Sequence, residues 1–132
     1  MKRYTLKLTA QDAPNPEQSI RDQIIALNDF VCSCGITAIN GLREDFAAKI
    51  ELRYNTLLSA LEEIYKNFSA KSMDSHLIQV QLNALNLAFK QLENDHICKV
   101  YTGKITCSEI GAKISSLEEN IFSSLLAPAP TI

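Results

Sequence analysis

The stretch from Ser75 to Phe89 contains no Asp, Glu, Lys or Arg, although charged residues make up 21% of the chain. Its apolar residues recur at helical spacing and form two separate stripes. The first stripe contains Ile78, Leu82, Leu85 and Phe89, and the second contains Val80, Ala84 and Leu87. A helix without charge on any face is usually covered on most of its sides. The helix predicted over 75–94 must therefore lie against several neighbours.

Two helices are predicted before it. Asn15 and Pro16 supply a cap residue and a proline at the first helical position, and Gly35 fits a left-handed C-terminal cap. These signals predict a helix over 16–34 and a second over 37–68, which would be about 45 Å long. Because the apolar stripe continues nearly in phase across Gly35, one kinked helix spanning both segments stays open as an alternative.

The last helix is predicted to begin where a hairpin ends. The segment "HICKVYTGKITC" is rich in β-branched and aromatic residues around a Thr-Gly pair, which predicts a small β-hairpin near 97–106. In that register Cys98 lies opposite Cys107. The residues at 106–109 also fit a capping box, so a helix over 107–126 follows directly.

The amino terminus differs from the rest of the chain, because apolar and polar residues alternate in "KRYTLKLT" and predict a strand over 3–9. The expected fold class is therefore mainly α: a helical bundle with one or two very long helices, a short N-terminal strand and the small hairpin. A chain of 132 residues with 46% hydrophobic content has the size and composition of one globular domain. We assign that domain to 1–126 and a flexible tail to 127–132.

Net charge and hydropathy limit the classes of partner. The formal net charge of -2 and the pI of about 5.7 provide no overall attraction to nucleic acid or anionic lipid. No apolar run approaches the length that spans a bilayer, and the basic amino terminus lacks the apolar core of a secretory signal. We expect a cytoplasmic protein without membrane contacts, whose four cysteines are reduced.

Five thiol or imidazole side chains are weak candidates for a metal site: Cys32, Cys34, His96, Cys98 and Cys107. They could converge at one end of an up-down bundle. However, residues i and i+2 on a helix point to nearly opposite sides, so Cys32 and Cys34 cannot both bind one ion. Zinc sites also use wider spacings. We therefore expect no metal and no cofactor, and interpret the cysteines as small buried apolar residues.

Two segments resemble catalytic or phosphate-binding motifs, but each lacks residues that the motif requires. The "GKIT" at 103–106 resembles a phosphate-binding loop, but Cys98 occupies the position of its first glycine and Ile105 replaces the required Ser or Thr. Glu93 and His96 form an E-x-x-H, the motif of di-iron bundles, but the second copy that such sites need is missing. We expect no catalytic residues and no enzymatic activity.

The favoured function is that of a non-enzymatic, homo-oligomeric helical module that acts through protein–protein association. Two uncharged segments, 30–42 and 75–89, leave more apolar helical surface than one short bundle needs to hide, so a second copy should cover the remainder. The expected interface residues are Tyr54, Leu58, Val80, Leu87, Ile36 and Ile39.

A small-ligand function is the first alternative. An oligomer could sequester an anionic, nucleotide-like molecule in pockets between subunits. The predicted helix amino ends at Asn15 and Thr106 would supply amide donors, and Lys104 would supply an ammonium group.

A DNA-binding regulator is the second alternative. The predicted strand carries Arg3, Thr5 and Lys7 on one face and precedes two helices around a Gly-x-Thr turn, which resembles the ribbon-helix-helix repressors over about the first third of the chain. This resemblance implies that strands from two chains pair and enter the major groove. The "QDAPNP" insertion lengthens the strand-to-turn distance and the net charge is acidic, so we rank nucleic-acid binding as unlikely.

Overall fold

The computed structural model describes residues 16–69 and 75–123, and this part of the chain is helical with no strand. Its helices are α1 (Pro16–Ile39), α2 (Glu44–Ser69), α3 (Ser75–Asn94), α4 (His96–Thr102) and α5 (Lys104–Ile121). The predicted strand over 3–9, the residue Asn15 and the tail over 127–132 lie outside the described residues.

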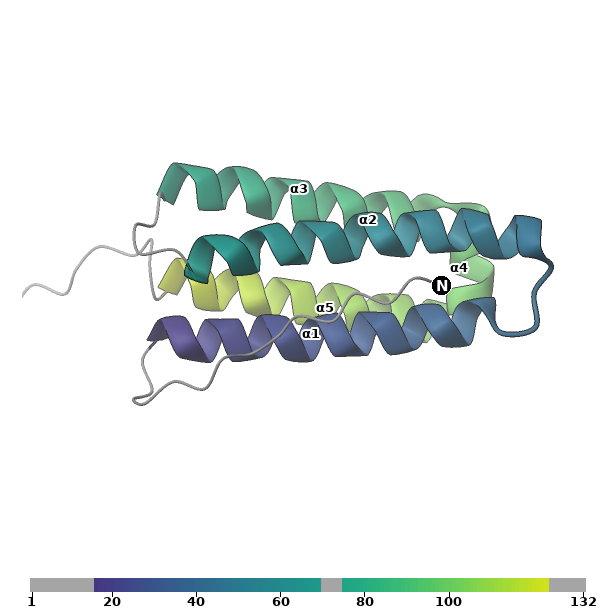
Figure 1. Cartoon of the computed structure of the whole chain (residues 1–132), viewed down its shortest axis with the longest axis horizontal. Coiled ribbons are helices and arrows are strands. Elements are labelled where there is room, and N and C mark those ends of the chain that lie inside the picture. Colours follow the sequence, from purple (N-terminus) through teal and green to yellow (C-terminus); the bar gives the residue numbers. More distant parts are fainter. Residues whose placement is uncertain (1–15, 70–74, 124–132) are drawn as a thin grey trace, which may run out of the picture.

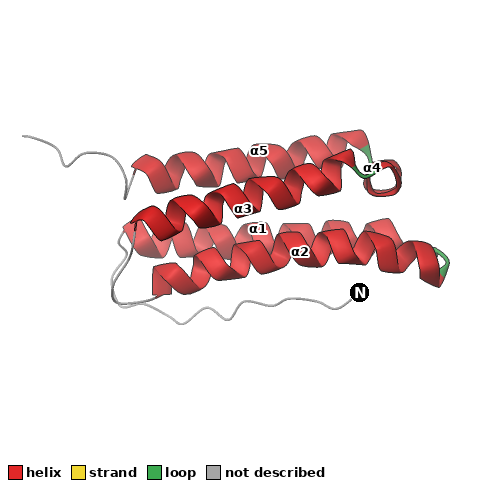
Figure 2. Ribbon diagram, turned by 90° about the horizontal axis from the view of Figure 1, so that it is seen from above, coloured by secondary structure: helices red, strands yellow, loops and turns green. Residues whose placement is uncertain are grey.

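The four long helices lie side by side, and the short α4 crosses one end of them (Figures 1 and 2). α1 packs against α2 and α5, and α2 packs against α3, whereas α3 has a smaller contact with α5. α4 touches all four long helices. The prediction of a helical bundle is confirmed.

An apolar stripe from each long helix forms the core, and on α2 Tyr54 and Leu58 beside that stripe are buried with it. The stripe predicted on α3 is buried as expected, and Leu92 continues it. Full burial of each Leu or Ile side chain contributes about 1.5–3 kcal/mol, so the inward stripes stabilise the bundle. The stripes consist of Ile20, Ile24, Leu27 and Val31 on α1, Ile50, Leu57, Leu61 and Ile64 on α2, Ile78, Leu82, Leu85 and Phe89 on α3, and Ile110, Ile114, Leu117 and Ile121 on α5.

The predicted boundary between the first two helices is wrong. α1 continues through Gly35 because two residues beyond it, Ala38 and Ile39, pack on the core. The chain turns instead at Gly41, whose φ of 78° lies in the region that favours glycine. Two separate helices result, so the single kinked helix is excluded. The longest helix is α2 with 26 residues, about 39 Å, and the longer helix predicted over 37–68 is not formed.

The predicted β-hairpin near 97–106 is also wrong, because this segment forms α4 and the first turn of α5. The side chain of Asp95 caps α4 by accepting hydrogen bonds from the N–H groups of Ile97 (3.0 Å) and Cys98 (3.2 Å). Gly103, with φ of 90°, ends α4 and donates to the carbonyl of Lys99. The cap and the burial of Cys98 therefore outweigh the local preference for strands.

α5 begins at Lys104, three residues before the predicted start. The predicted capping box at 106–109 is wrong, because these residues lie inside the helix and Gly103 precedes it without a side-chain cap. Cys98 and Cys107 consequently lie on two successive helices and do not face each other across a β-ladder.

The helical structure of α4 can be tested at its cap residue, Asp95. It caps α4 and its Oδ2 also accepts from Arg53 Nε at 3.2 Å. We expect Asp95→Ala to lower the free energy of unfolding by about 1 kcal/mol at pH 7. Burial opposes ionisation, but the hydrogen bonds from Cys98, Arg53 and Ile97 lower the pKa of Asp95 below its ordinary value.

A depressed pKa adds stability above the unfolded-state pKa of about 3.9, and this stability is lost as the pH falls through the folded-state pKa. Urea unfolding at pH 7 and near pH 3 should show the difference between wild type and Asp95→Ala shrinking in acid. Glu119→Ala, at an exposed carboxylate of α5, is the control. An unchanged stability of Asp95→Ala at pH 7 would contradict the cap.

Candidate protein-association surface

The large apolar side chains that stay exposed in the described residues fall into two groups. The first group lies on α2 and α3, and the second lies around α4, at the end of the bundle. The first group consists of Leu52, Leu77, Val80 and Leu87, and the second consists of Ile36, Val100, Tyr101 and Ile105.

The exposed residues of α3 form a continuous line that we call the α3 seam: Leu77, Val80, Ala84 and Leu87. Their spacing of three, four and three residues places them on one face of the helix. The exposed fractions of the three large side chains are 43% for Leu77, 48% for Val80 and 59% for Leu87. α3 therefore has two apolar stripes, and of these the described part of the chain covers only the other one.

A groove of about 320 Å³ lies beside the α3 seam, between α2 and α3. Its lining is mostly apolar and comes from both helices. The lining residues are Thr56, Ser59, Ala60 and Glu63 of α2, and Ala84, Leu87, Ala88 and Gln91 of α3. Leu52, which is 65% exposed, lies one turn before Thr56 on the same face of α2. The seam and the groove together make one surface, the α2/α3 face.

Charged side chains lie at the rim of this face and not in the seam: exposed Lys90 follows Leu87 by three residues, and exposed Lys49 precedes Leu52 by three. The side chains exposed beside the seam include Gln79 and Asn83, which are polar and uncharged. Glu63 is the charged residue in the groove lining, and Lys66 lies 3.7 Å from its carboxylate on the same helix. A face of this kind can bury its surface without desolvating an unpaired charge.

Two residues of the expected interface have no surface to offer. Tyr54 and Leu58 are fully buried in the core of the single chain, which corrects that part of the prediction. The hydroxyl group of Tyr54 lies 2.7 Å from Thr102 Oγ1 and joins α2 to the end of α4. Burial raises the pKa of Tyr54, so its hydroxyl stays protonated.

The other expected interface residues lie in two places. Val80 and Leu87 belong to the α3 seam. Ile36 is 44% exposed near the end of α1, and Ile39 packs partly against the core there. Ile36 and Ile39 therefore lie on α1, at the α4 end of the bundle, and are not part of the α3 seam.

A second hollow, of about 140 Å³, lies at the α4 end and is lined by hydroxyl, thiol and apolar groups. Of the expected ligand residues, Thr106 lines it and Lys104 does not. Both lie in the first turn of α5, and the N–H of Cys107, which was expected to be free after a cap at Thr106, donates instead to the carbonyl of Gly103 at 3.0 Å. The full lining is Ser33, Cys34, Thr37, Ala38, Tyr101, Thr102 and Thr106.

The cysteines lie in and around the core. Cys32, Cys98 and Cys107 are buried, Cys34 is partly exposed, and all four are free thiols. Burial raises the pKa of Cys34, of Cys107 and of Cys98, the last to about 12. Protonated thiols are poor nucleophiles and poor metal ligands. His96 is exposed, and within residues 16–69 and 75–123 no three His, Cys, Asp or Glu side chains are grouped to hold a metal ion.

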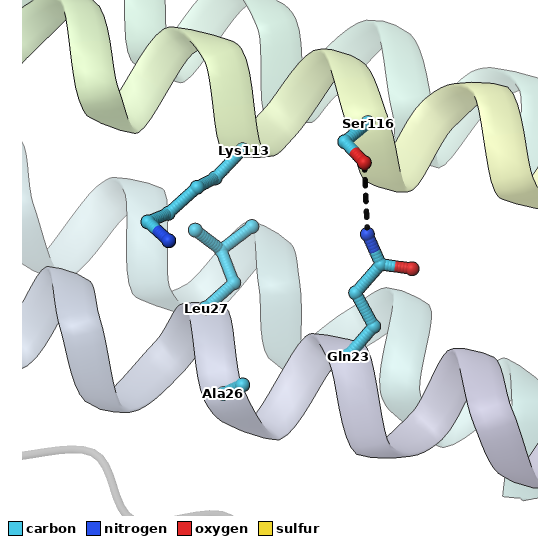
Figure 3. Close-up of a pocket in the computed structure, with 5 residues that line it drawn as sticks. All are labelled: Gln23, Ala26, Leu27, Lys113 and Ser116. Carbon is cyan, nitrogen blue, oxygen red and sulfur yellow. Dashed lines mark hydrogen bonds between the residues drawn. The ribbon is translucent and has the colours of Figure 1, made fainter.

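A third hollow, of about 200 Å³, lies between α1 and α5 (Figure 3). Gln23 and Ser116 face each other across it, and Gln23 Nε2 donates to Ser116 Oγ at 3.5 Å. The other end of the Gln23 amide accepts from Asn120 at 2.7 Å. The ammonium group of Lys113 lies 4.8 Å from the ring centroid of Phe30. Because the amide is engaged at both ends, this hollow offers little to an anion beyond one exposed ammonium group.

Sequence reasoning missed Leu77, Leu52 and the α2 side of the groove. Leu77 precedes Val80 by three residues and continues the second stripe of α3, so the spacing contained the signal. The residues of α2 in the groove are small or polar and have no apolar pattern of their own. Their part in the face follows from the packing of α2 on α3.

Comparison with known proteins finds no family model, no curated protein and no solved structure that matches this chain. Among the described helices, none combines the length and the hydropathy that crossing a membrane requires.

Proposed function

We propose that this chain is a non-enzymatic, homo-oligomeric helical module that works by protein–protein association, and that the α2/α3 face is where two copies meet. The observation that supports the proposal is the α3 seam. It is an apolar line on the outer side of a helix that carries no charge from Ser75 to Phe89. Contiguous exposed apolar surface of this kind marks interaction sites.

A second copy fits this face better than a charged partner. Any charged side chain placed against the seam would lose its hydration and find no opposite charge there. A copy of the same seam brings only apolar and neutral polar groups. In an isologous contact both subunits use the same patch, so each apolar position of the seam is buried once in each subunit.

The size of the face sets the expected strength. It is two helices wide and about four turns long, which corresponds to an area on the order of 500 Å² per partner. The total of about 1,000 Å² is at the lower limit for a specific interface. We therefore expect a reversible dimer with a dissociation constant in the micromolar range.

Ligand sequestration has less support. The hollow between α1 and α5 holds one ammonium group, and its amide is already engaged. The hollow at the α4 end has no charged lining residue. Neither provides the set of donors that an anionic, nucleotide-like molecule would need.

Sedimentation equilibrium of the purified chain tests the proposal. Between about 1 and 100 μM we expect the average mass to rise from that of the 14.7 kDa monomer toward twice that value. A monomer mass throughout this range would contradict self-association and leave a different protein as the occupant of the face.

A further inference from the structure

The spacings along the α3 seam are the same when they are read from either end of the helix. We infer that two copies pair through antiparallel α3 helices, with a two-fold axis at the level of Leu82. In this arrangement Leu77 lies opposite Leu87 of the partner subunit, and Val80 lies opposite Ala84 of the partner subunit. The inference rests on the proposed function and adds the orientation and register of the partner.

The spacing of the seam leads to this register. Because the spacings of three, four and three residues are symmetric, two antiparallel copies of the seam align residue by residue. With the axis at residue 82, all four seam residues oppose seam residues, and the small Ala84 meets the larger Val80 of the partner subunit. A shift of one heptad would leave two of the four seam residues without a seam residue opposite them, Leu77 and Val80 in one direction and Ala84 and Leu87 in the other.

The groove distinguishes antiparallel from parallel pairing. It lies at the 84–91 end of α3, where Ala84, Leu87, Ala88 and Gln91 line it. In the antiparallel dimer this end faces residues 77–80 of the partner subunit, so the partner subunit's Leu77 enters the groove beside Leu87. In a parallel dimer the two-fold axis would run along the helices and place the two grooves on opposite sides of the paired seams, so each groove would meet the side of the partner's helix on which the polar Asn83 is exposed. Close packing therefore favours the antiparallel pair.

Disulfide trapping tests the register. Cys34, the partly exposed thiol, is first replaced by Ser. Leu77→Cys and Leu87→Cys are then made in separate chains, one of which carries a tag that changes its mass. Each variant is oxidised alone and in an equal mixture at about 100 μM. Circular dichroism checks the fold of each variant, since both positions are exposed.

The expected result is a cross-linked heterodimer in the mixture and almost none in either variant alone. Equivalent residues in the antiparallel pair lie ten positions apart along the helix, about 15 Å, whereas a disulfide needs Cα atoms within about 7 Å. Cross-linking of Leu87→Cys with itself would show a parallel pair and overturn the inference.

The two proposals fail in different ways. A chain that sediments as a dimer but gives no cross-link in the mixture overturns the register and leaves self-association standing. A chain that is a monomer at 100 μM overturns both proposals.

Discussion

Replacing Leu87 by Glu should weaken self-association at least about 100-fold. Leu87 is 59% exposed in the monomer and lies in both the α3 seam and the groove. Each dimer contains two copies of it, and losing the burial of both side chains costs about 3 kcal/mol, which corresponds to roughly two decades in the dissociation constant. A buried carboxylate without a partner adds to this loss.

The measurement is sedimentation equilibrium of the variant and the wild type over the same concentrations. Ile105→Glu is the matched control, because Ile105 is 77% exposed but lies in the α4 group. It should leave the dissociation constant unchanged. If Ile105→Glu abolished the dimer and Leu87→Glu did not, the contact would lie at the α4 end and the α2/α3 face would be excluded.

Replacing Tyr54 by Ala should reduce the free energy of unfolding by about 3–5 kcal/mol, the cost of removing a large buried aromatic side chain. Tyr54 has no exposed surface and its hydroxyl group is bonded to Thr102. The loss arises inside one chain, so we expect a lower unfolding midpoint in urea at every protein concentration.

Tyr54→Phe is the control for this substitution. It keeps the ring in the core and removes only the hydrogen bond to Thr102, for which we expect a loss of about 1 kcal/mol. Neither variant should change the dissociation constant at temperatures where the chain is folded. A Tyr54→Phe chain that folds normally but no longer associates would return Tyr54 to the interface and contradict its buried position.

The apolar stripes of the long helices were predictable because they depend only on residue spacing. A helix turns about 100° per residue, so the line from Ile20 to Val31 and the line from Ile110 to Ile121 define inward faces in any bundle. The start of α1 at Pro16 was also predictable, because proline at the first helical position is a local signal that does not depend on tertiary contacts.

The α4 segment was mispredicted because its local signals conflict. β-branched and aromatic residues around Gly103 favour a hairpin, whereas the helix that forms depends on Asp95, which caps it from outside the segment. The helix end predicted at Gly35 is wrong for a similar reason, because the local signal is outweighed by contacts outside it. A glycine often ends a helix, but here the burial of Ala38 beyond it extends α1 by another turn.

The sequence by itself determined that α2 and α3 each carry a second apolar stripe, because periodicity needs no knowledge of neighbours. On α2 this stripe consists of Ala47, Tyr54, Leu58 and Tyr65, and on α3 it is the α3 seam. Only the tertiary structure decided which of these second stripes stays exposed to solvent. α2 packs extensively against both α1 and α3 and also touches α4, so Tyr54 and Leu58 are fully buried and Ala47 and Tyr65 are half-buried. α3 packs extensively against α2 alone and has smaller contacts with α4 and α5, so Leu77, Val80 and Leu87 remain exposed. Burial depends on how closely the neighbours surround a helix on each side, and that is a property of the whole bundle.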